Sequence, residues 1–418
     1  MSIIALLIII GRTFFVGPIR DLISNILYQK NMTIPPESIL ILVSFIFFSF
    51  LLLFRNKVFC KNNLTVFILL VFIILNNLLI KQNSPFLGYM LFFLLSSIVF
   101  MHASLNQCEK KFIINKLFII FILYASINLL YWLFVLNRKF DPSTGVPFYR
   151  LGGSLAHTVH LGPILIIFLL LYISIFRKRN KLTTLIDILL FSFFFFLIII
   201  SGSRLGLYLF FILIIIIFFD KNKSIGKLKN IAISFLTILI LVYFISLKLN
   251  LRYVNIDLTK EERLNTWISS IKSFRNYNLF DNIIGRGWGN YYKYWEWLES
   301  GGATWGGQNL FFDRGRLLLV SPHNSFIWIL AEGGLIPFIL SFIIIIYPIF
   351  KIATLRYFNE KKYLLFLTAA VFLSYMFDDV LIVAPGTALF SLAISYLSID
   401  EANRLSVDRR LKKQSASE

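Results

Sequence analysis

The stretch from residue 184 to residue 219 reads TLIDILLFSFFFFLIIISGSRLGLYLFFILIIIIFF, two apolar runs on either side of a Ser-Gly-Ser-Arg sequence. Each run, coiled as a helix, can cross a hydrocarbon core of ~30 Å. The runs lack the alternation of a barrel strand, and a helix satisfies its own backbone hydrogen bonds in lipid. The stretch therefore predicts two membrane-spanning helices joined by a tight turn at residues 201–203.

Similar runs recur along the 418 residues, which are 58% hydrophobic and have a mean hydropathy of +0.79. We expect an all-α polytopic membrane protein with about twelve transmembrane helices, forming one integral membrane domain over residues 1–418. The expected helices are residues 2–17, 36–54, 64–80, 86–103, 112–136, 158–176, 184–200, 203–219, 228–248, 323–350, 361–377 and 383–399. The first is interpreted as a retained helix rather than a signal peptide.

The net charge of +20 is explained by where the basic residues lie. They cluster in short loops at residues 55–61, 110–116, 177–181, 221–229, 351–362 and 404–413. This positive-inside pattern predicts that these loops and both termini are cytoplasmic, and no basic segment carries a motif that reads DNA or RNA. Cys60 and Cys108 fall on the same side, so we expect no disulfide. The polar residues 400–418 are expected to form a disordered cytoplasmic tail.

The long polar interval at residues 249–322 falls on the outer side and holds five of the seven tryptophans. Residues 260–274 have the spacing of an amphipathic helix, with Leu264, Trp267, Ile268 and Ile271 on one face. Residues 284–290 (Ile-Gly-Arg-Gly-Trp-Gly-Asn) then require unusual backbone angles or a close approach of the backbone to a ligand. In the aromatic run 288–297, the rings could lie at the membrane interface or stack on sugars. The candidates for glycan binding are Trp288, Tyr291, Tyr292 and Trp295.

Three outer arginines could hold an anion such as a diphosphate, because a guanidinium binds two phosphate oxygens at once. Arg204 lies beside small residues at the outer end of two apolar runs, although it could instead reach the lipid headgroups. Arg263 and Arg286 lie in the long loop, where either could be an ordinary solvated charge.

His323 is the candidate base, since the pKa of a histidine allows it to take a proton near neutral pH. Asn324 is its candidate orienting partner, and the alternative is a histidine that only borders a helix. His157 and His160 have the spacing of metal ligands but no third ligand nearby, so no metal is expected. The outer acids Asp378 and Asp379 could bind an ion, act as a base or cap a helix.

Five short motifs follow one another along the second half of the chain. They are Ser-Gly-Ser-Arg-Leu-Gly at 201–206, Glu-Arg-Leu-Asn-Thr-Trp at 262–267, Gly-Arg-Gly-Trp-Gly-Asn at 285–290, Pro-His-Asn-Ser-Phe at 322–326 and Leu-Ala-Glu-Gly-Gly-Leu at 330–335. The segment Tyr-Arg-Leu-Gly-Gly at 149–153 precedes them. In this order, the motifs resemble the O-antigen ligase/polymerase superfamily over roughly residues 150–345.

The resemblance implies a GT-C-like, inverting, metal-independent glycosyltransferase of the bacterial inner membrane that acts on its periplasmic face without a cofactor. Its donor would be an undecaprenyl-diphosphate-linked glycan, and its acceptor a lipid-linked chain or lipid A–core. By the same resemblance, Arg204 and Arg263 would hold the donor diphosphate and His323 would activate the acceptor hydroxyl. Arg286 is less typical and is assigned only an anion contact. Membrane lipids and a chain-length regulator are the further partners implied.

Three functions stay open at this point. We prefer a polymerase that joins lipid-linked repeat units to a ligase that transfers the glycan to another acceptor. A non-enzymatic flippase or transporter is the third reading. A transporter would place ionisable residues or broken helices near the bilayer midplane, whereas here the charges fall in loops or at helix ends.

Overall fold

The computed structural model describes residues 2–10, 36–55, 61–80, 86–131, 158–176, 184–220, 278–288, 324–355, 358–378, 380–383 and 385–414, together with 267, 271, 274–275, 312–313 and 316–317. The secondary structure of this part is helical except for one pair of two-residue strands. The N-terminal helices are α1 (Ser2–Ile10), α3 (Pro36–Phe54), α4 (Lys61–Leu79), α5 (Phe86–Ser104) and α6 (Gln107–Tyr131). Next come α7 (Thr158–Leu171), which continues as the π-helical turn η2 (Tyr172–Phe176), α9 (Thr184–Ser201), α10 (Arg204–Phe218) and the short α13 (Leu279–Ile284).

The antiparallel strands β1 (Phe312–Asp313) and β2 (Arg316–Leu317) pair Phe312 with Leu317. The C-terminal helices are α15 (Ser325–Gly333), α16 (Leu335–Ala353), α17 (Phe358–Met376), α18 (Val380–Val383) and α19 (Pro385–Gln414).

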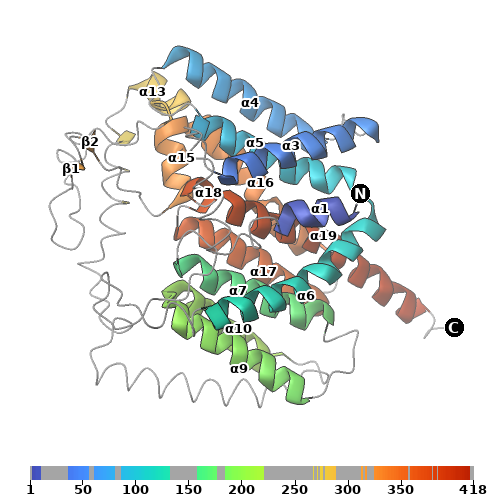
Figure 1. Cartoon of the computed structure of the whole chain (residues 1–418). Coiled ribbons are helices and arrows are strands. Elements are labelled where there is room, and N and C mark those ends of the chain that lie inside the picture. Colours follow the sequence, from blue (N-terminus) through green and yellow to red (C-terminus); the bar gives the residue numbers. More distant parts are fainter. Residues whose placement is uncertain are drawn as a thin grey trace.

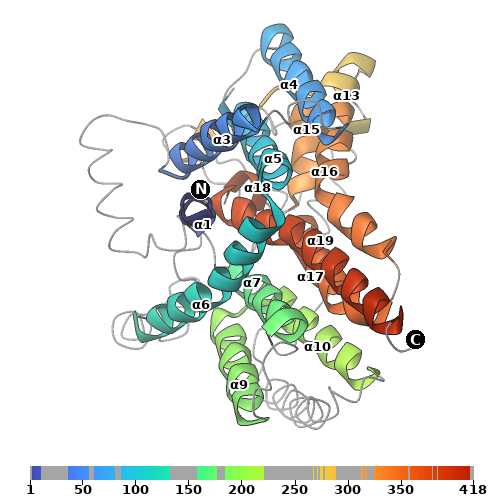
Figure 2. The ribbon, with the colours of Figure 1, turned by 90° about the vertical axis from the view of Figure 1, so that its right-hand side faces the viewer.

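The long helices lie side by side in one bundle. Figures 1 and 2 show them stacked from α9 and α10 on one side, through α7, α17 and α19, to α5, α3 and α4 on the other. Helix α7 lies inside, because every side chain from Leu161 to Ile175 is buried. Phe168 of α7 stacks on Phe121 of α6 at 3.5 Å between ring centroids and lies 5.5 Å from Phe390 of α19. A helix that is apolar on all sides belongs at the centre of such a bundle.

Two helices of the described part, α5 and α16, are long and apolar enough to cross a membrane. Shorter apolar helices occupy residues 40–54, 64–79, 161–175, 186–201 and 204–218. The outer surfaces of α3 and α4 expose large apolar side chains, among them Phe50, Leu64 and Leu78. The predicted helical class is thus confirmed, and the expected boundaries of α3, α5 and α9 agree with the structure to within one residue.

Two expectations about the helices are wrong. The single helix expected at 323–350 is broken into α15 and α16 by Gly334, whose φ of +82° and ψ of −176° are accessible in practice only to glycine. The tail expected to be disordered is helical as far as Gln414, because α19 continues beyond its apolar part without a break. The expected helix at 228–248 lies outside the described residues.

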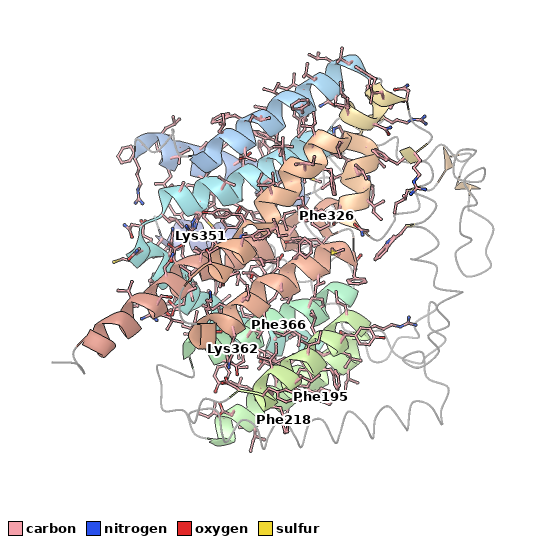
Figure 3. All side chains as sticks on the ribbon, turned by 180° about the vertical axis from the view of Figure 1, so that it is seen from behind. Phe195, Phe218, Phe326, Lys351, Lys362 and Phe366 are labelled. Carbon is pink, nitrogen blue, oxygen red and sulfur yellow. The ribbon has the colours of Figure 1, made fainter. Side chains whose placement is uncertain are left out.

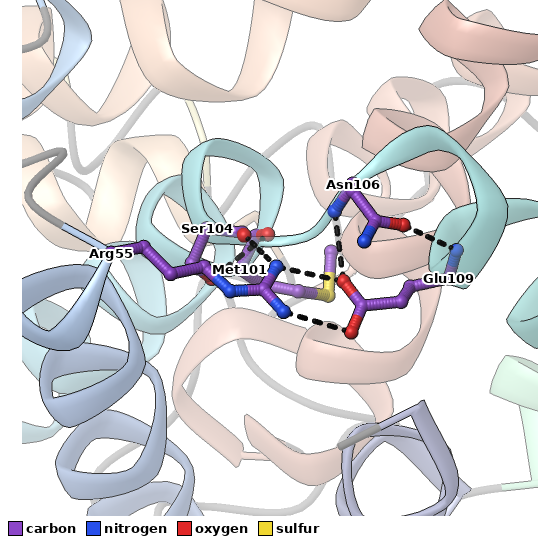
Figure 4. A network of polar contacts seen from close by, with 5 residues as sticks. All are labelled: Arg55, Met101, Ser104, Asn106 and Glu109. Carbon is purple, nitrogen blue, oxygen red and sulfur yellow. Dashed lines mark hydrogen bonds and ion pairs between the residues drawn. The ribbon is translucent and has the colours of Figure 1, made fainter.

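Several charged side chains that flank the helices pair with one another at one end of the bundle. Arg55, just after α3, donates to Glu109 of α6 at 2.8 and 3.0 Å and to the Ser104 carbonyl at 2.5 Å (Figure 4). Asn106 and Glu109 exchange backbone-to-side-chain hydrogen bonds of 2.9 Å. The Arg55 hydrogen bond holds the pKa of the Glu109 carboxyl below its usual value, and the same pair raises the pKa of Arg55.

Two further ion pairs join segments that are distant in sequence at this end. Lys110 of α6 lies 3.0 Å from Asp400 of α19, and Lys362 of α17 lies 2.5 Å from Asp220 after α10. In Figure 3, Lys351 and Lys362 lie toward the end from which α19 extends, whereas Phe326 lies toward the opposite end. Basic loops that the sequence assigns to one side therefore meet at one end of the bundle.

Candidate functional site

Arg204 begins α10, where this helix meets the start of α7. Ser203 caps α10 by accepting a 3.1 Å hydrogen bond from the backbone N–H of Gly206. Gly162 of α7 faces this cap so closely that a Cβ added there would lie 2.5 Å from the Ser203 Oγ atom. The Arg204 residue is partly exposed at this contact between two glycine-bearing helices. The small residues beside Arg204 thus allow α10 to pack closely against α7, a contact that sequence reasoning did not identify.

The glycine turn after α13 packs against the break between α15 and α16. Gly285 and Gly287 have φ angles of +89° and +93°, which explains why the motif has glycine at these two positions. The Gly287 N–H donates to the Glu332 carbonyl at 3.0 Å. A Cβ on Gly285 would lie 2.5 Å from the Gly334 nitrogen. The glycine motif predicts a close approach of the backbone to a partner. In the described part of the chain, that partner is the backbone at the break between α15 and α16.

Trp288 ends this turn and is fully buried. A Cβ on Gly88 of α5 would lie 2.7 Å from the Cδ1 and Cε2 atoms of the indole, and a Cβ on Gly333 would lie 2.8 Å from Cζ2 at its opposite edge. The indole thus fills the space between two glycines on different helices. This position corrects the expectation that Trp288 stacks on a sugar, because packing against protein occupies the ring.

Arg286 lies in the same turn with about a quarter of its side chain exposed. Its Nε atom is 3.3 Å from the Asp281 carboxylate of α13. An ion pair at this exposure contributes little to stability, so the pair mainly orients the guanidinium. An anion bound at Arg286 would also lie near the Asp281 carboxylate, whose negative charge would repel it.

The start of α15 is held by side chains of the Pro-His-Asn-Ser motif. Asn324 is the N-cap, since its Oδ1 atom accepts from the backbone N–H groups of Phe326 and Ile327 at 2.9 and 3.0 Å. Ser325 donates its backbone N–H and its hydroxyl to the Asp378 carbonyl at 3.1 and 2.9 Å. The helix therefore begins at Ser325, after His323, and Asn324 has a capping role beside the expected orienting one.

The long loop also reaches this end of the bundle. The Trp267 ring lies 5.7 Å from the Phe377 ring, which directly precedes Asp378. Trp267 follows Arg263 by four residues, and the two belong to one of the motifs quoted above. The candidate acid Asp378 is buried. Its backbone carbonyl organises the start of α15, which is a structural role that the sequence did not indicate.

Several candidates lie outside the described residues: Arg263, His323, Tyr291, Tyr292, Trp295, His157 and Asp379. His160 lies in the first turn of α7, and its side chain is not among those described. The described residues contain no group of three or more His, Cys, Asp or Glu side chains that could hold a metal ion.

Sequence reasoning missed Asn76, a buried residue of α4 that contacts both the glycine turn and α15. Its Nδ2 atom donates to the Ile284 carbonyl and, at 3.3 Å, to the Glu332 carbonyl. The signal that could have found it is an Asn-Asn pair at 76–77 inside an otherwise apolar run. A polar side chain costs free energy in such a run unless it is hydrogen-bonded, so it points to a specific partner.

Comparison of the chain with models of known families, with curated proteins and with solved structures finds no match. The motif order and the placement of the described motif residues are therefore the grounds for a functional proposal.

Proposed function

We propose that the protein is a polytopic membrane glycosyltransferase, a polymerase that joins undecaprenyl-diphosphate-linked repeat units of a surface polysaccharide. The proposed site faces the periplasm, on the inner membrane of a bacterium. The reaction is inverting and requires neither a metal nor a cofactor. This proposal rests on the resemblance of the ordered motifs and on where the structure brings their described members.

The observation that carries the proposal is the separation of the two ends of the bundle. Asp220, which follows α10, meets Lys362 and Tyr363 near the start of α17. Arg204 begins α10, and Phe377 and Asp378 follow α17, so these residues belong to the opposite ends of the same two helices. Trp267 contacts Phe377, and Ser325 contacts Asp378. These two motif residues and Arg204 therefore lie away from the basic loops, which supports a site on the outer face of a membrane.

A deep apolar bundle beside a polar site suits a donor with a polyprenyl tail. The tail would lie against the exposed apolar side chains of α9 and α10, next to Arg204; these helices expose Leu189, Phe196 and Phe211. The diphosphate would then be held at the surface by Arg204 and Arg263, whose guanidinium groups match its oxygens.

In the proposed reaction, His323 takes the proton of the acceptor hydroxyl as its oxygen attacks the anomeric carbon of the donor sugar. The diphosphate leaves from the opposite face of that carbon, so the configuration of the carbon inverts. Arg204 and Arg263 stabilise the negative charge that develops on the leaving diphosphate, which is the electrostatic work that a metal ion does in other enzymes. Arg286 is assigned only an anion contact, which the neighbouring Asp281 carboxylate would weaken.

Gel analysis of the surface glycan in the native host tests the proposal, with the gene deleted and then restored. A change from a ladder to a single repeat unit on the acceptor is expected for a polymerase. Loss of all glycan from the acceptor, with long chains accumulating on the lipid carrier, would instead identify a ligase. An unchanged ladder after deletion would contradict both and favour a transporter.

A further inference from the structure

Asn76 connects the ends of two helices that are far apart in sequence. Its side-chain Nδ2 atom donates to the carbonyls of Ile284, the last residue of α13, and of Glu332, near the end of α15. The residue is fully buried on α4. Carbonyls in the last turn of a helix have no partner within the helix, so one amide group here satisfies acceptors from two helices.

The backbone around this contact is tightly packed. Backbone atoms of Gly285 and Gly334 approach each other so closely that a Cβ on Gly334 would lie 2.5 Å from the Ile284 carbonyl carbon. The Gly287 N–H donates to the Glu332 carbonyl, which is also an acceptor of Asn76. The turn, the helix break and Asn76 therefore form one hydrogen-bonded unit.

This unit is rigidly connected to the candidate catalytic motif. Helix α15 has nine residues and spans about 13 Å from the Asn324 cap to Gly333. A short, capped helix moves as one body, so its C-terminal anchor acts together with the Ser325–Asp378 contact to set the position of its N-terminal end. His323 directly precedes that cap in sequence. Arg286 lies in the turn at the other end of the same unit.

From these contacts we infer that Asn76 is a positioning residue, which holds the 285–288 turn and α15 together. It thereby helps to set the placement of Arg286 relative to the start of α15, which His323 precedes in sequence. The inference rests on the proposed function. Asn76 touches no reacting group, and it acts through the backbone carbonyls of Ile284 and Glu332. Its removal should loosen the turn while the transmembrane bundle stays folded.

Hydrogen–deuterium exchange of the purified full-length protein in detergent tests the contact without reference to activity. The variant is Asn76→Leu, which keeps the branching of the side chain at Cγ in an apolar helix and removes its donor. We expect the backbone amides of residues 285–288 to exchange about tenfold faster, because the turn opens locally more often. Asn77→Leu is the matched control, since the Asn77 side chain has no hydrogen-bond partner within the described residues.

The same two variants are then expressed in the deletion strain, and the glycan ladder is compared. Faster exchange together with a lost or shortened ladder, in Asn76→Leu alone, is the expected result. Unchanged exchange would overturn the inference whatever the ladder shows. Faster exchange with a normal ladder would also overturn it, because the turn would then play no part in positioning. Failure of the proposed function is seen separately, as an unchanged ladder in the deletion strain itself.

Discussion

Ser325 and Asp378 are joined by two hydrogen bonds across 53 residues, from the backbone N–H and the hydroxyl of Ser325 to one carbonyl. The same hydroxyl oxygen accepts a 3.2 Å hydrogen bond from the backbone N–H of Leu381. One small side chain therefore ties the first residue of α15 to the turn between α17 and α18. The start of the candidate catalytic helix is placed by tertiary contacts as well as by its own cap.

Replacing this hydroxyl should weaken the fold locally. In Ser325→Ala, the buried Leu381 N–H loses its acceptor, which costs about 1–3 kcal/mol. The thermal midpoint of the purified protein should fall, and glycan synthesis should fall with it. Ser341→Ala is the control, because the Ser341 hydroxyl is buried with no hydrogen-bond partner in the described part of the chain. Equal midpoints for the two variants would contradict the role of Ser325.

The packing of Trp288 predicts an overpacked variant. Gly88→Ala places a methyl group against the indole and should cost about 1–3 kcal/mol, as is typical when a packed core receives an extra carbon. In combination with Trp288→Leu, the added cost of Gly88→Ala should shrink, because the clashing ring is absent. Strictly additive effects of the two changes on the thermal midpoint would show that these residues do not interact.

The proposed base predicts a variant that folds but does not react. His323→Ala should abolish the ladder, whereas the protein should still insert into the membrane at its normal level. The reason is that His323 is the residue proposed to take the proton of the acceptor hydroxyl. Glycan gels and quantitative blots of the membrane fraction measure the two properties. Normal turnover by His323→Ala would exclude this histidine as the base.

The proposed diphosphate ligands predict a difference between charge and geometry. Arg204→Ala and Arg263→Ala should weaken use of the lipid-linked donor, measured as an increase in its KM together with a lower kcat. If charge alone matters, Lys should restore much of the activity. If two-oxygen binding by the planar guanidinium matters, Lys should be as damaging as Ala. Donor kinetics unaffected by the Ala variants would remove these arginines from the site.

The Arg55–Glu109 pair predicts a pH dependence of stability at the end of the bundle with the basic loops. Because the pKa of Glu109 is lower in the folded protein, its contribution is present above the pKa of the unfolded carboxyl. It is lost as the pH falls through the folded value, where the carboxylate takes a proton. Glu109→Gln should therefore flatten the decline of the thermal midpoint between pH 7 and pH 3. A decline identical to that of the wild type would show that the pair contributes nothing.

Much of the helical structure could be predicted from the sequence, because long apolar runs have few other ways to satisfy their backbone hydrogen-bonding groups. The boundaries of α3, α5 and α9 agree with the structure for this reason. The break at Gly334 was missed, since a Gly-Gly pair is also tolerated inside apolar helices and only its neighbours decide its backbone angles. The helical end of α19 was missed because polar composition alone does not distinguish a tail from a continued helix.

The helical class of the described residues, their principal helix boundaries and the motif order follow from the amino-acid sequence alone. Local chemistry decides these properties: hydrophobic length, caps and loop charge act within a few residues. Contacts between distant helices place Trp288 between Gly88 and Gly333 and let Asn76 bridge Ile284 and Glu332. These contacts join residues up to 256 positions apart, and their energies depend on shape complementarity between helices that no local pattern encodes.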